Sequence, residues 1–225
     1  MKNNSYSMRA LALLLSYPDE KTRSQMSAVI DVLTKEDALT KSRLSELKAF
    51  ADHLQQIDPL EAESRYVETF DRGRSTCLNL FEHIHGDSRD RGPAMIDLAQ
   101  TYTQSGLNLD PDELPDHLCV VLEFASTQEP EVAKSFLGEM SHILNAIFSG
   151  LLKRESPYAA VIAAVLELSG NKAQAVSIPV EETLDESWQE PEAFDGCSSR
   201  GQPRPDQEQP IHFVKKNQNT EGVAA

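Results

Sequence analysis

Apolar side chains recur every three or four positions along most of the first 170 residues, which is the spacing of one face of an α-helix. The first such run ends before Pro18, and Asp19 follows as the cap of a second helix. No segment alternates apolar and polar residues with the period of two that is typical of a half-buried strand. The pattern therefore predicts an all-α fold: a single multi-helix bundle with several short connections and one long central connection.

Start and stop residues divide this pattern into separate helices. Asp58-Pro59, Glu129-Pro130 and Ser156-Pro157 each place a proline where a helix can begin. Gly106 and Gly170 each follow the last apolar position of a helix. The predicted apolar stripes cover residues 8–15, 26–33, 44–57, 59–70, 95–102, 118–125, 132–151 and 161–168.

The long central connection runs from Tyr66 to Met95 and interrupts the helical pattern. It collects aromatic rings, arginines, carboxylates, histidines and glycines in a segment that fits neither a clean helix nor a clean strand. Long, chemically dense connections inside regular folds commonly carry function. The segment contains no GxGxxG, Walker-type GK[ST], CxxC or HExxH motif, so no standard reaction chemistry is encoded there.

The composition changes at about residue 171, where the apolar period ends and Pro, Gln, Ser, Glu and Asn dominate. Residues 181–195 carry only acidic charges. We therefore expect residues 1–170 to form the helical domain and residues 171–225 to form an acidic, mostly disordered tail. Trp188 and Phe194 are exceptions in this tail: they either anchor it on the bundle or occupy a groove.

The formal net charge of −15 bounds the kind of partner. It argues against nucleic acid and against anionic membrane surfaces, whose phosphates attract Lys and Arg. It favours a basic or amphipathic partner, although many cytosolic proteins are acidic without a specific reason. The N-terminal apolar run Ala10–Leu15 is too short to span a bilayer and predicts a first core helix of a cytoplasmic protein.

Cysteine usage points to a reducing compartment. The chain has an odd number of cysteines, three, and they are widely spaced: Cys77, Cys119 and Cys197. This pattern indicates neither a disulfide framework nor a zinc site. Cys77 lies near Arg74 and two histidines, which would favour a reactive thiolate. The alternative is that Cys77 and Cys119 are buried, inert thiols.

A di-iron centre is the sharpest enzyme hypothesis. Glu82/His85 and Glu139/His142 both fit the E-x-x-H spacing that helical bundles use to hold such a centre. The chemistry requires both pairs to lie in mid-helix and to point inward, but His85 is followed directly by Gly86. The spacing is also a common accident in a chain rich in Glu.

Two short charged motifs have a structural and a functional interpretation. In Gly86–Gly92, Asp87 or Ser88 caps the next helix, or Arg89 and Arg91 line a charged rim. In Glu113–His117, Asp116 lies in the first turn of the next helix, where its charge meets the helix dipole favourably. The functional interpretation presents Asp116 and His117 at the mouth of a groove.

Three segments resemble the TorD/NarJ-like family of redox-enzyme maturation chaperones: the N-terminal helices, Tyr66–Phe70 and Glu113–Phe124. Phe70–Thr76 and Leu80–Gly92 look like the narrower branch that serves respiratory nitrate reductase, and so does Trp188–Phe194 in the tail. The likeness covers roughly residues 5–195, and beyond Gly196 the tail matches no pattern of the family.

The resemblance implies an all-helical cytoplasmic protein without catalytic activity. Its expected partner is the apo form of the nitrate reductase alpha subunit, bound by its N-terminal segment, together with the alpha–beta complex and molybdenum cofactor biosynthesis proteins. Such a chaperone holds the client competent for insertion of the molybdenum cofactor and an iron–sulfur cluster, binds no cofactor stably itself, and is absent from the finished enzyme. It neither contacts nucleic acid nor inserts into the membrane.

A binder of a basic amphipathic segment needs an apolar groove with a carboxylate rim. We predict that Tyr66, Phe70 and Phe81 supply the apolar groups. The predicted rim carboxylates, with His117 beside them, are Glu82, Asp87, Asp90, Asp116 and Glu123. The arginines predicted to fix the loop are Arg74, Arg89 and Arg91. A generic helical adaptor with an acidic tail remains the third hypothesis.

Overall fold

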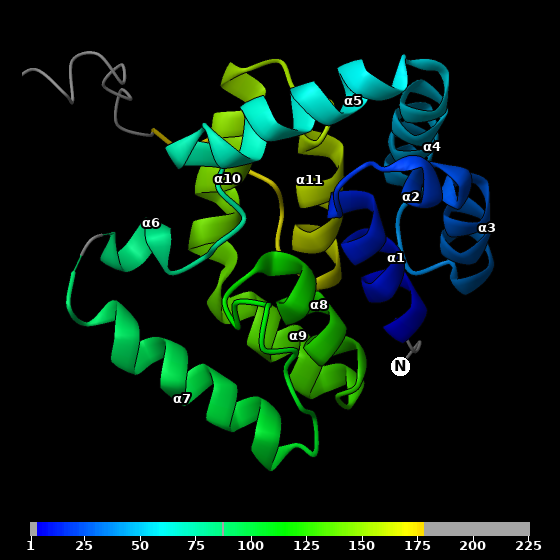
Figure 1. Cartoon of the computed structure of the whole chain (residues 1–225). Helices are drawn as coiled ribbons and strands as arrows, with labels where there is room; N and C mark the ends of the chain where they lie inside the picture. Colours follow the sequence, from blue (N-terminus) through cyan, green and yellow to red (C-terminus); the bar gives the residue numbers. More distant parts are fainter. Residues whose placement is uncertain (1–3, 87, 178–225) are drawn as a thin grey trace, which may run out of the picture. The chain divides into compact units, whose positions relative to one another are not determined.

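Every regular element in the part of the chain that the structure describes is helical (Figure 1). This computed structural model describes residues 4–86 and 88–177. In chain order the elements are α1 (Ser5–Leu15), α2 (Glu20–Ser24), α3 (Met26–Glu36), α4 (Lys41–Gln56), α5 (Pro59–Tyr66), the π-helix η1 (Val67–Asp71), the 3-10 helix η2 (Arg74–Thr76), α6 (Glu82–His85), α7 (Arg91–Gln104), α8 (Leu118–Ser126), α9 (Pro130–Glu139), α10 (Ser141–Lys153) and α11 (Ala159–Leu168). The predicted all-α bundle is confirmed.

The main core is built around α1 and α11, which lie side by side (Figure 1). From Val161 to Leu166, α11 is buried on all sides, as expected of a central helix. Met8 and Leu11 of α1 are fully buried against it. α3, α4, α8 and α10 contact this central pair, and their apolar stripes close the core.

Local capping chemistry fixes where several helices begin, as predicted. The Asp19 carboxylate accepts a hydrogen bond from the Thr22 amide at 2.7 Å, so it caps α2. Asp58 caps α5 in the same way, directly before a proline at the first helical position. Gly170 ends α11 with a φ of 80°, a left-handed conformation that favours glycine.

Two helices that the apolar spacing predicts as continuous are broken, so these predictions were wrong. The run that starts after Asp19 divides at Gln25 into α2 and α3. The run from Pro130 to Leu151 divides at Met140 into α9 and α10. Because α9 and α10 both pack on α11, the change of direction at Met140 lets Leu137 and Leu144 be fully buried. A straight helix would carry one of these faces away from α11.

The chain after α11 does not leave the bundle at once. The amide of Gln174 donates to the Asn145 side chain at 2.8 Å, and the amide of Val176 donates to the Ser149 hydroxyl at 2.8 Å. By contacts the chain divides into residues 1–181 and 182–225. The second unit, with Trp188, Phe194 and most of the predicted tail, lies outside the described residues.

No helix in residues 4–86 or 88–177 combines the length and the apolar character that a membrane-spanning segment needs.

Candidate functional site

The first part of the central connection is packed into the main core. The Tyr66 hydroxyl donates to the carbonyl oxygen of Leu15 at 2.8 Å. The Tyr66 ring centroid lies 4.9 Å from that of Phe70, and both rings contact Tyr158. Tyr66 is 7% and Phe70 3% exposed. The prediction placed these two rings on the wall of an open groove, whereas the structure uses them to fill the core, because clustered aromatic rings remove a large apolar area from water.

The second part of the central connection pairs with the segment directly before α8 through an isolated antiparallel bridge between Asn79 and His117. The amide of Leu80 donates to the carbonyl oxygen of Asp116 at 3.0 Å, and the amide of Leu118 donates to that of Leu78 at 2.9 Å. These two bonds cross-link segments that are far apart in the sequence. They fix where α6 and α8 begin relative to each other.

Asp116 strengthens this fastening with its side chain. Its carboxylate is fully buried and accepts a hydrogen bond from the Phe81 amide at 3.0 Å. The Arg91 guanidinium lies 4.0 Å away. Burial raises the pKa of Asp116, and the Phe81 hydrogen bond and the Arg91 charge oppose this rise. We call this arrangement the Asp116 clamp.

The clamp corrects the predicted place of Asp116. The sequence motif placed it in the first turn of a helix at the mouth of a groove, but α8 begins at Leu118 and Asp116 precedes it in a turn. Because the carboxylate is fully buried, it does not reach a solvent-facing rim in this structure. Its chemistry is that of a positioning residue, since it holds Phe81 and the start of α6.

A groove opens next to the clamp, between the first turns of α1, the C-terminal end of α7, the 105–117 connection and α8. Its volume is about 490 Å³, which is in the usual range of ligand sites. We call it the acidic groove. Its lining residues are Arg9, Tyr102, Leu107, Asn108, Leu109, Asp110, Glu113, Val120, Glu123, Phe124 and Thr127.

The floor of the acidic groove is a small apolar core separate from the main one. It consists of Leu98, Tyr102, Val120 and Phe124, and the Tyr102 and Phe124 rings lie 4.6 Å apart. Phe81, Leu107 and Leu109 pack against this second core. Its position is held by the Tyr102 hydroxyl, which donates to the carbonyl oxygen of Pro115 at 2.7 Å.

The charges around this floor are mostly negative. Asp110, Glu113 and Glu123 line the groove and are exposed to solvent. Its arginine, Arg9, donates through Nε to the Ser126 hydroxyl at 2.9 Å. The groove thus combines aromatic and aliphatic groups with exposed carboxylates, which suits a segment that has apolar side chains and positive charge.

The predicted site residues fall into several places. Glu123 lines the acidic groove, and the half-buried Phe81 packs on the second core beneath it. His117 is the N-cap residue of α8, and burial lowers its pKa. The carboxylate of Glu82 accepts a hydrogen bond from Cys77 Sγ at 3.2 Å. The side chains of Arg74, Arg89 and Asp90 are exposed, Arg91 approaches the clamp, and Asp87 lies outside the described residues.

The structure also shows how the helix after Gly86 begins. α7 starts at Arg91 with Asp90 at the cap position, and Asp90 makes no side-chain cap bond. Ser88 does not cap α7 as predicted; its hydroxyl oxygen accepts a hydrogen bond from the Asp90 amide at 3.2 Å.

Sequence reasoning missed much of the acidic groove. Leu107, Leu109 and Asp110 lie in a connection that carries no helical period, and no site was predicted there. The available signal was the alternation of Leu107 and Leu109 directly before a cluster of acids, which is unusual for a solvated turn. Arg9 could not be found in this way, because it comes from a helix about 100 residues away.

The enzyme hypotheses find no support in the described residues. No group of three or more His, Cys, Asp or Glu side chains in residues 4–86 and 88–177 could hold a metal ion. Glu139 and His142 lie on either side of the break at Met140, so they do not form the mid-helix pair that a di-iron centre needs. Burial raises the pKa of the Cys77 thiol to about 12, opposite to the shift of a reactive thiolate.

The fold is that of a known class of helical proteins. A crystal structure of a candidate redox enzyme maturation protein from Archaeoglobus fulgidus superposes with a TM-score of 0.55, covering 74% of this chain and 94% of that one at 20% identity. At this identity the likeness defines the fold alone. The chain therefore has the all-helical fold of this maturation protein.

Sequence comparison identifies the family. The profile of the nitrate reductase delta subunit family matches residues 35–164, and the chain belongs to this family. It is 38% identical over 183 residues to the nitrate reductase molybdenum cofactor assembly chaperone NarJ of Escherichia coli (strain K12), which is 81% of this chain and 77% of that protein. It is also 37% identical over 155 residues to the nitrate reductase-like protein NarX of Mycobacterium tuberculosis (strain H37Rv), covering 68% of this chain and 23% of that protein. The resemblance to the NarJ-like chaperones is confirmed.

Proposed function

We propose that this protein is a maturation chaperone for nitrate reductase and has no catalytic activity of its own. Membership of the delta subunit family and the likeness to a molybdenum cofactor assembly chaperone support this role. In it, the protein acts in the cytoplasm on the apo form of the catalytic alpha subunit, alone or within the alpha–beta complex.

The acidic groove is the surface we assign to the client. The observation that carries this assignment is the combination of the half-buried Leu107 and Leu109, which pack over the buried rings of Tyr102 and Phe124, with exposed carboxylates. These carboxylates are Asp110, Glu113 and Glu123. A basic amphipathic N-terminal segment of the alpha subunit would lay its apolar face on the floor and its positive charges against the carboxylates. The family match spans residues 35–164 and so includes the groove except for Arg9.

The two components of the groove have different energetic roles. Burial of the client's apolar side chains against Leu107 and Leu109 contributes most of the affinity, at roughly 25 cal/mol for each Å² removed from water. Each exposed ion pair at the rim adds only ~0.2–1 kcal/mol and weakens with salt. The rim therefore contributes mainly to the rate of association and to the choice of partner.

Isothermal titration calorimetry with a synthetic peptide of the first residues of the alpha subunit tests the assignment. We expect the double variant Glu113→Gln/Glu123→Gln to bind about 2- to 30-fold more weakly, because it removes two rim charges. The matched control is Asp31→Asn/Asp52→Asn, which removes two exposed carboxylates from α3 and α4 and should leave the affinity unchanged. Equal affinities of both double variants and the unmodified chain would show that the groove is not the client site.

A scrambled peptide of the same composition separates a chaperone from a generic adaptor. An adaptor that recognises its partner only by charge would bind the scrambled peptide and the native peptide equally well. The chaperone should prefer the native order of apolar and basic residues, because the floor of the groove has a fixed shape.

The maturation step follows from client binding. While the chaperone holds the alpha subunit, the client stays open for insertion of the molybdenum cofactor and an iron–sulfur cluster and does not dock early on its membrane anchor. Proteins of molybdenum cofactor biosynthesis would deliver the cofactor to the client, and the chaperone would not retain it. A strain that lacks this protein should make nitrate reductase subunits without molybdenum cofactor, whereas fully active membrane-bound enzyme in that strain would contradict the role.

A further inference from the structure

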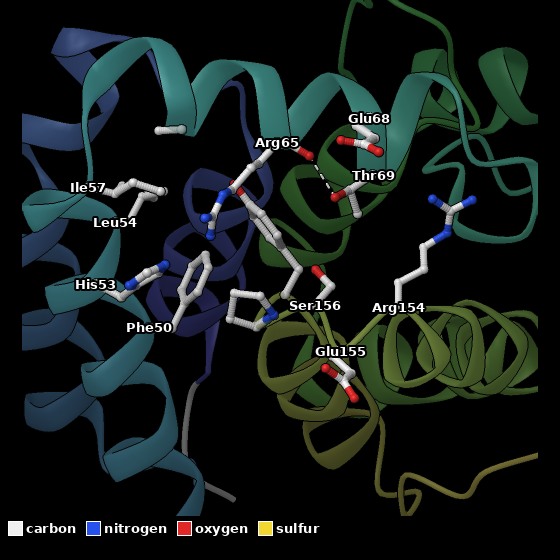
Figure 2. Close-up of a pocket in the computed structure, with 13 residues that line it drawn as sticks. Phe50, His53, Leu54, Ile57, Arg65, Glu68, Thr69, Arg154, Glu155 and Ser156 are labelled. Atoms are coloured by element: carbon white, nitrogen blue, oxygen red, sulfur yellow. Dashed lines mark hydrogen bonds between the residues drawn. The ribbon is translucent and has the colours of Figure 1, made fainter.

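A second cavity lies away from the acidic groove and shares no lining residue with it. It is formed by the C-terminal half of α4, the α5–η1 segment and the turn that joins α10 to α11, and its volume is about 410 Å³ (Figure 2). We call it the α5 cavity. It is lined by Phe50, His53, Leu54, Ile57, Ala62, Arg65, Glu68, Thr69, Arg154, Glu155, Ser156, Pro157 and Tyr158.

One buried polar group of the α5 cavity lacks a partner. Tyr158 is 4% exposed, and its hydroxyl has no hydrogen-bond partner among the residues that the structure describes. A buried hydroxyl without a partner costs about 1–3 kcal/mol, so proteins rarely leave one unused. Tyr66, which lies beside Tyr158 in the same aromatic cluster, does have a partner, the carbonyl oxygen of Leu15. The Tyr158 hydroxyl is therefore a buried donor that a ligand in the cavity could use.

The backbone on two sides of the α5 cavity is irregular. Glu68 and Thr69 belong to the π-helix η1, a rare element that is frequent at functional sites. On the other side, Glu155 has a φ of 52°, in the left-handed region that residues with side chains seldom adopt. Such backbone costs of order 1–3 kcal/mol and persists only where the surrounding structure imposes it. Two uncommon backbone states thus meet at one cavity.

The lining of the cavity offers hydrogen-bond donors from Tyr158 and from two arginines, together with two glutamates. Burial raises the pKa of Tyr158, so the phenol stays protonated and can donate. Figure 2 shows the Arg65 side chain directed toward the Phe50 ring, while Arg154 lies on the opposite side of the cavity. Glu68 and Glu155 also line the cavity, and these carboxylates are exposed to solvent, as Arg65 and Arg154 are. The Arg65 guanidinium also forms an ion pair with Glu61 one turn earlier in α5. A ligand would therefore meet aromatic surface, a phenol hydrogen and guanidinium groups.

We propose that the α5 cavity binds a small ligand that joins a flat apolar ring to an anionic oxygen group, a carboxylate or a phosphate. The ring would pack between Phe50, Leu54 and Pro157, which offer apolar surface. The anionic oxygens would accept hydrogen bonds from the Tyr158 hydroxyl and from Arg65, whose planar guanidinium matches either group. This site is independent of the client segment that the acidic groove receives.

Displacement of the fluorescent probe 1-anilinonaphthalene-8-sulfonate from the full chain tests the proposal. Three naphthalene competitors share one ring system and differ in the attached group: 1-naphthyl phosphate, 1-naphthoate and the neutral 1-naphthylmethanol. We expect the two anions to displace the probe at concentrations about tenfold lower than the neutral alcohol, as charge-assisted hydrogen bonds predict. The better of the two anions identifies the preferred oxygen group.

Two variants locate the binding. Arg65→Gln should weaken the anionic competitors about tenfold and leave the neutral one within about twofold. Tyr158→Phe should weaken them about threefold, and it keeps the ring, so the fold is not at risk. The matched control is Arg72→Gln, which removes an exposed arginine outside the cavity and should change nothing. A further variant, Ala62→Leu, should fill the cavity and abolish displaceable binding of all the naphthalene compounds.

Several results would overturn the proposal. They are the absence of probe binding, equal displacement by charged and neutral competitors, and unchanged binding in both Arg65→Gln and Tyr158→Phe. Displacement of the probe by the client peptide would also overturn it, because the cavity would then belong to the client surface.

Discussion

The Asp116 clamp gives a prediction whose sign depends on the charge of one buried side chain. Asp116→Ala removes the acceptor of the Phe81 amide and should lower the free energy of unfolding by about 1–3 kcal/mol. Asp116→Asn keeps an oxygen that can accept from the Phe81 amide, removes the charge, and puts an NH2 group in place of the second carboxylate oxygen. We expect the free energy of unfolding of Asp116→Asn to stay within about 1 kcal/mol of that of the unmodified chain near neutral pH. Loss of the attraction to Arg91 destabilises the variant, whereas removal of a buried charge stabilises it, so the two effects oppose each other.

The pH dependence distinguishes these contributions. Because the pKa of Asp116 is raised in the folded state, the folded protein holds this proton more tightly than the unfolded chain does. The contribution of Asp116 to stability is therefore complete below the unfolded pKa of 3.8 and declines as the pH rises through the folded pKa. Relative to the unmodified chain, Asp116→Asn should become progressively more stable over that window and then level off.

Urea unfolding followed by circular dichroism, from about pH 4 to about pH 8, measures this difference. Comparison with Asp116→Asn cancels the titration of every other carboxylate, since the two chains differ only at this position. A stability difference that does not change with pH, or one that favours the unmodified chain as the pH rises, would refute the reasoning.

Three further predictions concern buried groups. Tyr66→Phe should lower the free energy of unfolding by about 1–3 kcal/mol, because it leaves a buried carbonyl of α1 without its donor, whereas Tyr158→Phe should be neutral or stabilising in the same denaturant titration. Gly150→Ala should destabilise by more than about 1 kcal/mol in thermal unfolding, because the added Cβ would lie 2.8 Å from a backbone oxygen of η2. Cys77 and Cys119, whose pKa values burial raises to about 12, should react with iodoacetamide much more slowly in the folded than in the urea-unfolded chain, and equal rates would contradict their burial.

Local chemistry made the starts of several helices predictable from the sequence. Asp19 and Asp58 cap helices through their own neighbours, and the proline after Glu129 sets the start of α9, so no distant contact is needed. The breaks at Gln25 and Met140 were not predictable, because the apolar period continues through both. They arise from how the two pieces pack on other helices.

The candidate site was predictable only in part for a similar reason. Asp116 belongs to a motif that the sequence marks as informative, but the partner of its carboxylate, the Phe81 amide, is 35 residues away. From the sequence alone, the nearest explanation for Asp116 is therefore a favourable interaction with the dipole of the helix that follows it. Tyr66 and Phe70 drew attention as aromatic residues in a dense segment, and nothing local distinguishes a core ring from a groove ring.

The central claim is that the acidic groove holds the N-terminal segment of the unfinished alpha subunit. Photo-crosslinking tests it most directly, with a client peptide that carries a benzophenone in place of one apolar side chain and mass spectrometry of the joined products. The account predicts crosslinks to the floor and walls of the groove, at residues 102–109 and 120–127. Crosslinks confined to α3 and α4, or spread evenly over the surface, would contradict it.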